Sequence, residues 1–405
     1  MYSFSASLEA VVNTFLNAEQ ESLLENYRAF VAEFVQPVAP ELEKQAGSPG
    51  GLSALKELLG TLGSKGYLGI GCSTEYGGKG GKFVDLALFS EALGEVDPGL
   101  ALTFAAHTAA LELIDKFGTE TQKSRYLPLL ARGEVVGAVA IAEENAGSDF
   151  RAQTTEVGID GDSVVLSGRK TWVVNGDLAQ LAVVSGKFKD KLVLCLVDLA
   201  ENAGAIKPGS HRDKLGLRSA RTCDIEFASL ELGEASILGY QKPGDLESAV
   251  DLDESTASMI DFAHNVTKTL VASSAVGLLE AAVKLSVGRA NSRQQFGAAI
   301  GRLQAIQWKL ADLSAESSAA RLLTLRAAWS KDEAPEEFPR HAAMCKFYAA
   351  RTARVHSSEA VQIFGSLGIS AEEPVEKLYR DAKVMEICEG TSEIQKNIIA
   401  SEVGA

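Results

Sequence analysis

The stretch VGAVAIA, residues 136–142, marks a change in the spacing of apolar residues along the chain. Before it, apolar residues recur at every third or fourth position, which is the pattern of an amphipathic helix that buries one face. From residue 136 the spacing shortens to two, as in a strand whose successive side chains point to opposite faces of a sheet. The stretch therefore predicts the start of a β region in a chain that is otherwise helical.

Five further segments between about residues 136 and 240 repeat this spacing of two, and turn-forming residues separate them. No segment long enough for a helix lies between these candidate strands, so βαβ units and a parallel sheet are disfavoured. A small antiparallel sandwich or barrel is the better prediction. The segments are DSVVLSG (162–168), KTWVV (170–174), LAVVSG (181–186), KLVLCLVDL (191–199) and CDIEF (223–227).

Helical patterns flank the β region on both sides. From about residue 7 to 133 they are separated by Gly and Pro clusters, and after roughly residue 255 they lengthen into candidates for a bundle. The predicted domains are therefore an all-helical domain (1–135), a β-domain (136–245) and a helical bundle (246–405). The acidic segment KPGDLESAVDLDES, residues 242–255, is expected to be the hinge between the last two.

The composition is that of a soluble globular protein, and it argues against several classes of function. With 39 Lys and Arg against 54 Asp and Glu, the net charge of -15 disfavours binding to nucleic acid or to anionic membranes. The five cysteines lie far apart without CxxC spacing, so neither a disulfide framework nor a metal site is expected. The first twenty residues contain no Lys or Arg, and no apolar run is long enough to span a membrane. We expect a cytoplasmic protein.

The nonapeptide ICEGTSEIQ, residues 387–395, places a carboxylate at a break between two helical patterns. In the ordinary interpretation, Gly390 closes the first helix, and Ser392 with Gln395 forms a capping box for the second. In the functional interpretation, apolar neighbours and a close backbone approach desolvate Glu389, which then acts as a general base. The nonapeptide alone leaves both interpretations open.

Three other segments also have an ordinary and a functional interpretation. AEENAGSD (142–149) is a common turn, or a loop whose small residues let the backbone approach a ligand. In GRKTWVVNGD (168–177), Trp172 is a core residue, or it stacks on a planar cofactor. In SRQQFG (292–297), Arg293 ends a helix, where a cation is favoured by the dipole, or it binds a phosphate.

The order and spacing of these segments resemble the acyl-CoA dehydrogenase flavoprotein family, from about residue 18 to the C-terminus. The most specific parts of the resemblance are YRDAK followed by EGTSEIQ, and SRQQFG. In chain order the matching segments are GYLGIGCSTEYGG (66–78), AEENAGSD, KTWVVNG, KLGLRSARTCDIEF (214–227), SRQQFG, AVQIFGSLGIS (360–370), PVEKLYRDAKV (374–384) and ICEGTSEIQ.

The resemblance implies an α+β multidomain fold with a helical N-terminal domain, a middle antiparallel β-barrel or sandwich and a C-terminal four-helix bundle. It also implies a homotetramer, or a dimer, with FAD between subunits. The implied reaction belongs to fatty acid metabolism. A base removes the α-proton of an acyl-CoA thioester while a hydride leaves the β-carbon for flavin N5, giving the trans-2-enoyl-CoA. Electrons then pass to an electron-transfer flavoprotein or another acceptor.

The resemblance also assigns roles to single residues. Glu389 takes the position of the catalytic base; an earlier position that some branches of the family use is here Thr267, which cannot serve. Trp172 covers the flavin ring, and Arg293, Phe296 and Gln304 hold the FAD of a neighbouring subunit. The implied FAD contacts are Ile141, Ala142, Trp172, Val174, Arg293, Phe296, Gln304, Gln362, Ser366, Thr391 and Glu393, and the implied substrate contacts are Ser148, His264, Asn265, Lys268 and Gly390.

The sequence departs from the family pattern at two places. Two threonines whose hydroxyls normally face the flavin are here Ala142 and Val174, and the Asp and Arg that normally contact CoA are here Asn265 and Lys268. Three alternatives therefore stay open beside the dehydrogenation of an acyl-CoA. They are the same chemistry on an acyl-carrier-protein thioester, a flavin-binding paralogue that is not a dehydrogenase, and a DNA-associated branch that the net charge disfavours.

Overall fold

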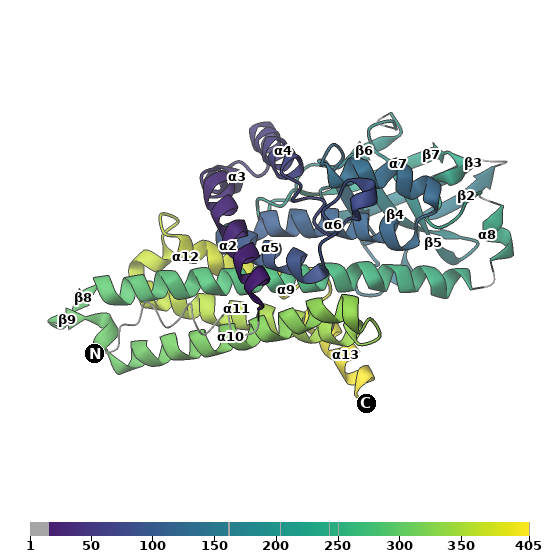
Figure 1. Ribbon diagram of the computed structural model, residues 1–405. Coiled ribbons are helices and arrows are strands. Elements are labelled where there is room, and N and C mark those ends of the chain that lie inside the picture. The colour runs from purple at the N-terminus through teal and green to yellow at the C-terminus, as the bar shows by residue number, and fades with distance from the viewer. Residues whose placement is uncertain (1–15, 161–162, 203, 243, 250, 405) are drawn as a thin grey trace.

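The computed structural model describes residues 16–160, 163–202, 204–242, 244–249 and 251–404 (Figure 1). A helical N-terminal part leads into a β-domain, and long helices complete the chain, as the sequence predicts. The helices of the first part are α2 (Ala18–Phe30), α3 (Ala39–Lys44), α4 (Pro49–Ser64), α5 (Phe83–Val96), α6 (Pro98–Phe117) and α7 (Glu120–Ala131), with a π-helical turn after α2 (Val31–Val35). The helical pattern expected from about residue 7 begins outside the described residues.

Local sequence fixes where several of these helices begin. The Asn17 side chain accepts a hydrogen bond from the backbone of Gln20, whose own side chain bonds back to Asn17, so a capping box starts α2. Thr119 and Gln122 form the same arrangement at the start of α7. Buried Asp97 caps α6 through the amides of Gly99 and Leu100.

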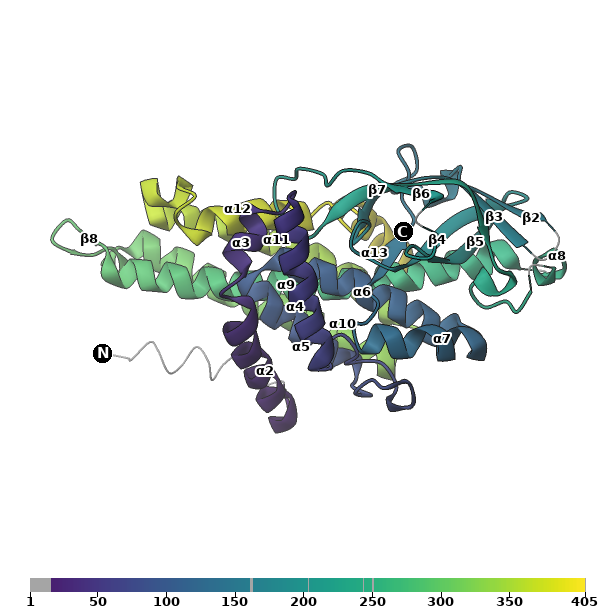
Figure 2. The same cartoon turned by 90° about the horizontal axis from the view of Figure 1, so that it is seen from above.

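The β-domain is one curled seven-stranded sheet, which lies at one end of the molecule (Figure 2). Its strands are β1 (Gly137–Ala140), β2 (Glu156–Asp160), β3 (Ser163–Val174), β4 (Leu181–Phe188), β5 (Lys191–Asp198), β6 (Ile206–Pro208) and β7 (Thr222–Leu232), in the order β1-β4-β2-β3-β7-β6 with β5 also on β4. Most pairs are antiparallel, as predicted, but β1 and β2 both run parallel to β4. The prediction missed these parallel contacts because the connection 141–155 between β1 and β2 contains only a three-residue 3₁₀ turn (Phe150–Ala152) and no helix of crossover length.

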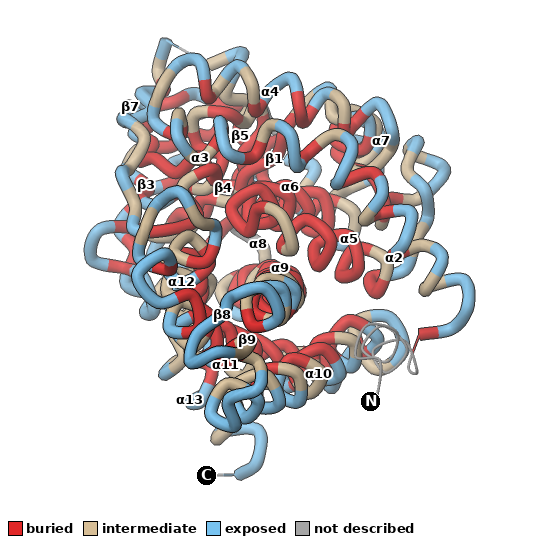
Figure 3. Tube along the Cα trace, turned by 90° about the vertical axis from the view of Figure 1, so that its left-hand side faces the viewer, coloured by how far each residue is buried: buried red, intermediate tan, exposed pale blue. Residues whose placement is uncertain are grey.

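The C-terminal part is built around the 41-residue helix α9 (Leu252–Ser292), which packs against α5 and α6 on one side and α10 and α11 on the other (Figure 3). Its length and apolar composition would suit a membrane span, but 72% of the apolar window is buried inside the protein, as in a core helix. The other elements are α8 (Asp245–Ser248), α10 (Gln304–Glu333), α11 (Phe338–Phe364), α12 (Pro374–Met385) and α13 (Ser392–Glu402), with the hairpin β8 (Gln294–Gln295) and β9 (Ala298–Ala299) between α9 and α10.

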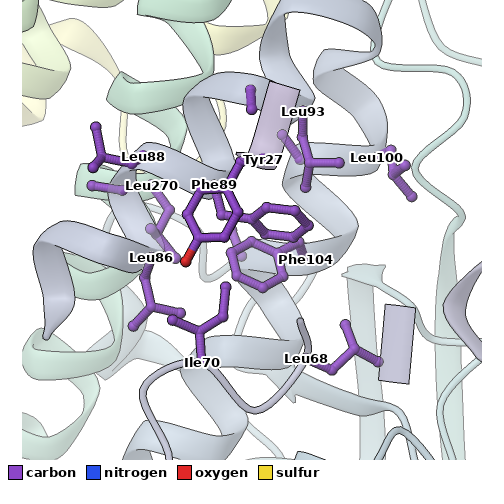
Figure 4. Close-up of a cluster of buried hydrophobic side chains, with 14 of the residues drawn as sticks. Tyr27, Leu68, Ile70, Leu86, Leu88, Phe89, Leu93, Leu100, Phe104 and Leu270 are labelled. Atoms are coloured by element: carbon purple, nitrogen blue, oxygen red, sulfur yellow. The ribbon is translucent and has the colours of Figure 1, made fainter. Parts of the chain in front are cut away.

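An aromatic cluster joins the N-terminal helices to α9 (Figure 4). Phe89 of α5 contacts both Tyr27 of α2 and Phe104 of α6 edge to face, with ring centroids 5.1 Å apart in each pair. Leu270 of α9 belongs to the same buried cluster. Such pairs favour one relative orientation of the rings, so the cluster fixes how α2, α5 and α6 sit on α9.

Two glycines let α5 and α9 cross in close contact. A Cβ atom on Gly277 would lie 2.1 Å from the carbonyl oxygen of Glu91, and one on Gly94 would lie 2.3 Å from that of Ser274. Backbone atoms cannot move aside as a flexible side chain can. The two helices therefore approach each other only because both crossing positions lack a side chain.

We expect Gly277→Ala to lower the free energy of unfolding by about 2 kcal/mol, because the added methyl group forces α5 and α9 apart. Gly288→Ala, an exposed position of the same helix with open space around it, should instead raise stability by roughly 0.5–1 kcal/mol. Urea unfolding of both variants tests this. Equal effects in the two variants would mean that the crossing does not constrain the fold.

Candidate functional site

The segment between α12 and α13 turns sharply at Glu389 and Gly390, which both adopt left-handed backbone angles, with φ of 55° and 86°. Such an angle is uncommon for a residue that has a Cβ. The predicted caps are wrong in detail. Helix α12 ends at Met385, before Gly390, and Thr391 caps α13 in place of Ser392, by accepting a hydrogen bond from the Ile394 amide at 3.4 Å. The side chain of Gln395 donates to the carbonyl oxygens of Glu389 and Gly390 instead of completing a capping box.

The Glu389 carboxylate is anchored on α9. The Thr267 hydroxyl donates to its Oε2 atom across 2.6 Å. Within the described residues, the backbone N–H of Glu389 has no hydrogen-bond partner. One residue therefore presents a carboxylate and a backbone N–H without a hydrogen-bond partner among these residues. A carboxylate can remove a proton beside a carbonyl group, and an N–H can bond the carbonyl oxygen as negative charge develops there.

Two buried lysines lie on the helices around this turn. Lys346 of α11 donates to the Gly390 carbonyl oxygen across 2.5 Å, and burial lowers its pKa. Lys268 of α9 donates to the Asn265 side chain across 3.1 Å. Burial lowers the pKa of Lys268 to about 8, although Asp261 and Glu389 counteract the shift. The surroundings of the carboxylate are therefore cationic.

The other predicted substrate contacts lie near the same part of α9. His264 makes an edge contact with the ring of Phe150, with centroids 6.2 Å apart, so the loop that carries Ser148 approaches α9. Burial and the nearby Lys268 ammonium lower the pKa of His264 to about 3, so its imidazole is neutral at pH 7. Asn265 is buried, whereas Ser148 is exposed. His264, Asn265 and Lys268 therefore lie within about one helical turn of Thr267, whose hydroxyl bonds the Glu389 carboxylate.

Sequence reasoning missed a buried ion pair that holds the loop between β1 and β2 against β3. The Glu143 carboxylate accepts hydrogen bonds from the amides and hydroxyls of Thr154 and Thr155 and pairs with the Lys170 ammonium at 2.8 Å. Burial alone would raise the pKa of Glu143, but these donors hold it at about 2. Lys170 also bonds the Ile141 carbonyl oxygen across 3.0 Å. The signal in the sequence was a lysine at a position of β3 that the spacing of two makes inward-facing.

Trp172 is not a core residue, because 54% of its surface is exposed. The register of β3 against β7 shifts between Lys170 and Val173, and Trp172 has a φ of 56° in this bulge. The Arg212 guanidinium lies 4.6 Å from its ring centroid. Ala142 lies beside it, since its carbonyl accepts from the Thr171 amide at 2.8 Å. Val174, partly buried, packs against the same cluster as Cys388.

A second group of predicted FAD contacts lies far from this region. Arg293 follows the end of α9, and Phe296 is 91% exposed at the tip of the β8–β9 hairpin. The hairpin and the β-domain lie at opposite ends of the molecule (Figure 1). Along α9, Arg293 is 26 residues from Thr267, or roughly 39 Å at 1.5 Å per residue. Gln304, Gln362 and Ser366 are also exposed. One chain therefore does not bring the two groups together.

A cavity of about 270 Å³ lies beside Thr391 and Glu393, the predicted contacts on α13. Arg354 and Lys383 both pair with Glu386 there. Arg351 and Lys396 form no ion pair with the residues that the structure describes. Lys396 lies 5.1 Å from the ring centroid of Phe347 and interacts with the Glu393 carboxylate. The four cations of the lining outnumber its two carboxylates, which suits an anionic group such as a diphosphate. The lining residues are Phe347, Arg351, Arg354, Lys383, Glu386, Ile387, Thr391, Ser392, Glu393 and Lys396. No group of three or more potential metal ligands occurs in the described part of the chain.

Three family models match this chain in order along its length. They are the N-terminal, middle and C-terminal domains of acyl-CoA dehydrogenase, at residues 17–134, 138–230 and 259–404. A probable acyl-CoA dehydrogenase of Bacillus subtilis is 34% identical, over 97% of this chain and all of the relative.

Two solved structures illustrate the range of similar proteins. Butyryl-CoA dehydrogenase from Megasphaera elsdenii matches with a TM-score of 0.87 at 29% identity, over 96% of this chain and 98% of its own. The prolyl acyl carrier protein oxidase AnaB matches with a TM-score of 0.86 at 25% identity, over 96% of this chain and all of its own.

We expect Lys170→Met to destabilise the protein by about 3–5 kcal/mol, because it leaves the buried Glu143 carboxylate without its cation. The double variant Lys170→Met/Glu143→Gln removes both charges and should recover part of the loss. Chemical unfolding of the two variants measures the difference. A double variant less stable than Lys170→Met alone would contradict the pairing.

Proposed function

Because this chain belongs to the acyl-CoA dehydrogenase family, whose members are oxidoreductases, we propose that it desaturates an acyl-CoA thioester between the α- and β-carbons with Glu389 as the base. One observation carries the proposal most directly. The Glu389 carboxylate is held by the Thr267 hydroxyl at 2.6 Å, and the N–H of the same residue has no partner among the described residues.

The chemistry of these groups suits removal of a weakly acidic α-proton. Proton removal develops negative charge on the thioester oxygen, and the free Glu389 amide is a donor for that charge. The left-handed turn at Glu389 and Gly390 presents the amide and the carboxylate from one residue. The proton passes to a carboxylate oxygen of Glu389. FAD, when bound, supplies a hydride acceptor at its N5 atom.

The residues present are compatible with FAD. Trp172 is half-exposed, with the Arg212 guanidinium over its ring, and four cations line the cavity beside Thr391 and Glu393. Ala142 and Val174 have no side-chain hydroxyl, so polar contacts to the flavin on this side come from the backbone. We therefore expect FAD to bind with a reduction potential that differs from that of relatives with both threonines.

A shared site between two copies explains why the predicted contacts divide into two distant groups. In this proposal Arg293 and Phe296, exposed at the end of α9, reach the FAD of a second copy. An apolar stripe on the outer face of α10 supports association of copies, since Trp308, Leu322 and Trp329 are 61%, 40% and 50% exposed. With exposed Ala315 they recur every seven residues, which suits packing against another helix. We propose a homotetramer, or a dimer as its minimal unit.

The acyl carrier and the electron acceptor are further parts of the proposal. We favour CoA, because the family models and the Bacillus relative carry that name. A carrier-protein thioester is the alternative, supported by the similarity to the prolyl acyl carrier protein oxidase and by Lys268 in place of the family's arginine. An electron-transfer flavoprotein is the proposed acceptor.

We expect Glu389→Gln to retain bound FAD but to lose anaerobic bleaching of the flavin by acyl thioesters by at least about 10²-fold, because the amide cannot take up the α-proton. Stopped-flow absorbance under anaerobic conditions measures the rate, with short, branched, cyclic and aromatic acyl-CoA compounds as substrates. Bleaching at the wild-type rate would exclude Glu389 as the base. If the wild-type protein binds no flavin, the proposed function itself fails.

We expect subunit complementation between Arg293→Ala and Glu389→Gln, because the proposal places the two residues of one site on different chains. Each variant alone should be inactive, the first through loss of FAD and the second through loss of the base. When the two chains are refolded together in equal amounts, about a quarter of the sites should contain both native residues. Bleaching per bound flavin and per chain measures this fraction, and a fully inactive mixture would contradict a shared site.

A further inference from the structure

Glu389 is held in place by its own turn and by side chains from helices α9 and α11. The proposed reaction uses groups of the turn and gives no role to the side chains from the two helices. Thr267 of α9 bonds the carboxylate, and Lys346 of α11 bonds the carbonyl of the next residue, Gly390. Some branches of the family have their base at the position of Thr267, and the resemblance gave Thr267 itself no role. Lys346 belongs to none of the motifs that carry the resemblance.

We infer that Thr267 and Lys346 are positioning residues for Glu389, Thr267 by serving its carboxyl group in both protonation states and Lys346 by fixing the turn and favouring the carboxylate. The inference rests on the proposed function, because it needs Glu389 to be the base.

The surroundings of Thr267 allow its hydroxyl to act as a donor or as an acceptor. Its Oγ1 atom lies 2.6 Å from Glu389 Oε2, 3.2 Å from the Ala263 carbonyl oxygen and 3.1 Å from that of His264. When Glu389 is ionised, the hydroxyl proton goes to the charged acceptor, which forms the stronger bond. When Glu389 holds the abstracted proton, its O–H donates to Oγ1 and the hydroxyl proton turns to a helix carbonyl. The same contact therefore survives proton transfer.

Lys346 is fully buried, and its one hydrogen bond in the described structure goes to the Gly390 carbonyl oxygen. Gln395 donates to the same oxygen across 3.0 Å, so the left-handed turn is held from two helices. Burial lowers the pKa of Lys346, which means that the charged ammonium costs folding free energy. An effect of the Lys346 ammonium on the neighbouring Glu389 carboxylate would explain why this buried charge is present.

Other charged or titratable groups also lie near the Glu389 carboxylate and the Lys346 ammonium. Lys268 on α9 adds a second cation near the carboxylate, and its pKa is lowered to about 8 by burial. Cys388 stays neutral at pH 7, because burial raises the pKa of its thiol to about 12. The groups that act on Lys346 or Lys268 are Asp261 on α9, Cys345 on α11, Glu386, Cys388 and Glu389 in the turn, and Glu393 on α13. Removing one of the two lysine cations therefore weakens the positive potential at the Glu389 carboxylate but does not remove it.

The first experiment replaces the Thr267 hydroxyl by a methyl group. Thr267→Val keeps the shape of the side chain, and Thr267→Ser keeps the hydroxyl. We expect Thr267→Val to reduce the rate of flavin bleaching about tenfold and to move the acid limb of kcat/KM to higher pH, because a hydrogen bond to the ionised carboxylate is lost. Thr267→Ser should retain both the rate and the limb. An unchanged limb in Thr267→Val would overturn the role of Thr267.

The second experiment separates the charge of Lys346 from its hydrogen bond. Lys346→Met removes both, whereas Lys346→Gln removes the charge and leaves a donor for the Gly390 carbonyl. We expect both variants to shift the acid limb of kcat/KM to higher pH by about one unit, because a cation near the Glu389 carboxylate is lost. Lys346→Met should also have a lower kcat than Lys346→Gln, because it cannot bond the Gly390 carbonyl. The melting temperature of Lys346→Met should not fall below that of the wild type. A lowered melting temperature with an unchanged acid limb would mean that Lys346 is merely structural.

A readout without turnover and a matched control complete the test. Infrared difference titration against Glu389→Gln follows the Glu389 carboxylate band directly, and its midpoint should move in the same direction as the kinetic limb. Lys284→Met removes one charge from an exposed position of α9. This control should change neither the midpoint of the infrared titration nor the acid limb of kcat/KM. If Glu389→Gln still bleaches the flavin, the proposed function fails. If Glu389→Gln is inactive but the midpoints of Thr267→Val and Lys346→Met match the wild type, only this inference fails.

Discussion

The burial of α9 along most of its length is the constraint on which the rest of the structure depends. The helix crosses α5 where Gly94 and Gly277 leave no room for a side chain, and α10 and α11 cover its other side. A helix packed in this way cannot bend at one end without disturbing the other layers. It therefore fixes the separation between Thr267, beside Glu389, and Arg293 at the far end. In the proposed FAD site, which uses residues from both ends, the residues of the far end would come from a second copy of the chain.

The sequence was sufficient for the main division of the fold because each part has its own spacing of apolar residues. The spacing of two predicted β1, β4, β5 and β7, and it predicted β3 as two separate strands. It missed β2 and the three-residue strand β6. The longer helical patterns predicted the bundle. The parallel contacts of β4 with β1 and β2 were not predictable, since they depend on the path of the loop 141–155 and not on any residue pattern. The resemblance to a known family supplied the expectation that Glu389 is a base, which local sequence left undecided.

Of the details that sequence reasoning missed, one depends on the local backbone and two depend on contacts between distant parts of the chain. Ser392 was a reasonable N-cap by residue type, but the backbone turn at Glu389 and Gly390 gives that position to Thr391. Lys170 and Glu143 are 27 residues apart and become partners only when β3 lies beside the loop that follows β1. Thr267 and Glu389 are separated by 122 residues. Lys170 left a local signal, its inward-facing position on β3, but neither pair leaves a local sign of which residue is the partner.

The polar groups of the site are unevenly distributed, and this has a chemical consequence. On the proposed flavin side, Ala142 and Val174 have no hydroxyl, and Lys170 of the Glu143–Lys170 pair bonds the backbone carbonyl of Ile141. On the proposed substrate side, Thr267 donates to the Glu389 carboxylate, and the Lys268 and Lys346 ammonium groups interact with it electrostatically. Interactions of the second kind are stronger in a buried site than in water, because little solvent screens them. In the proposed reaction, the side chains around Glu389 would therefore control the proton more than the side chains beside the flavin control the electrons.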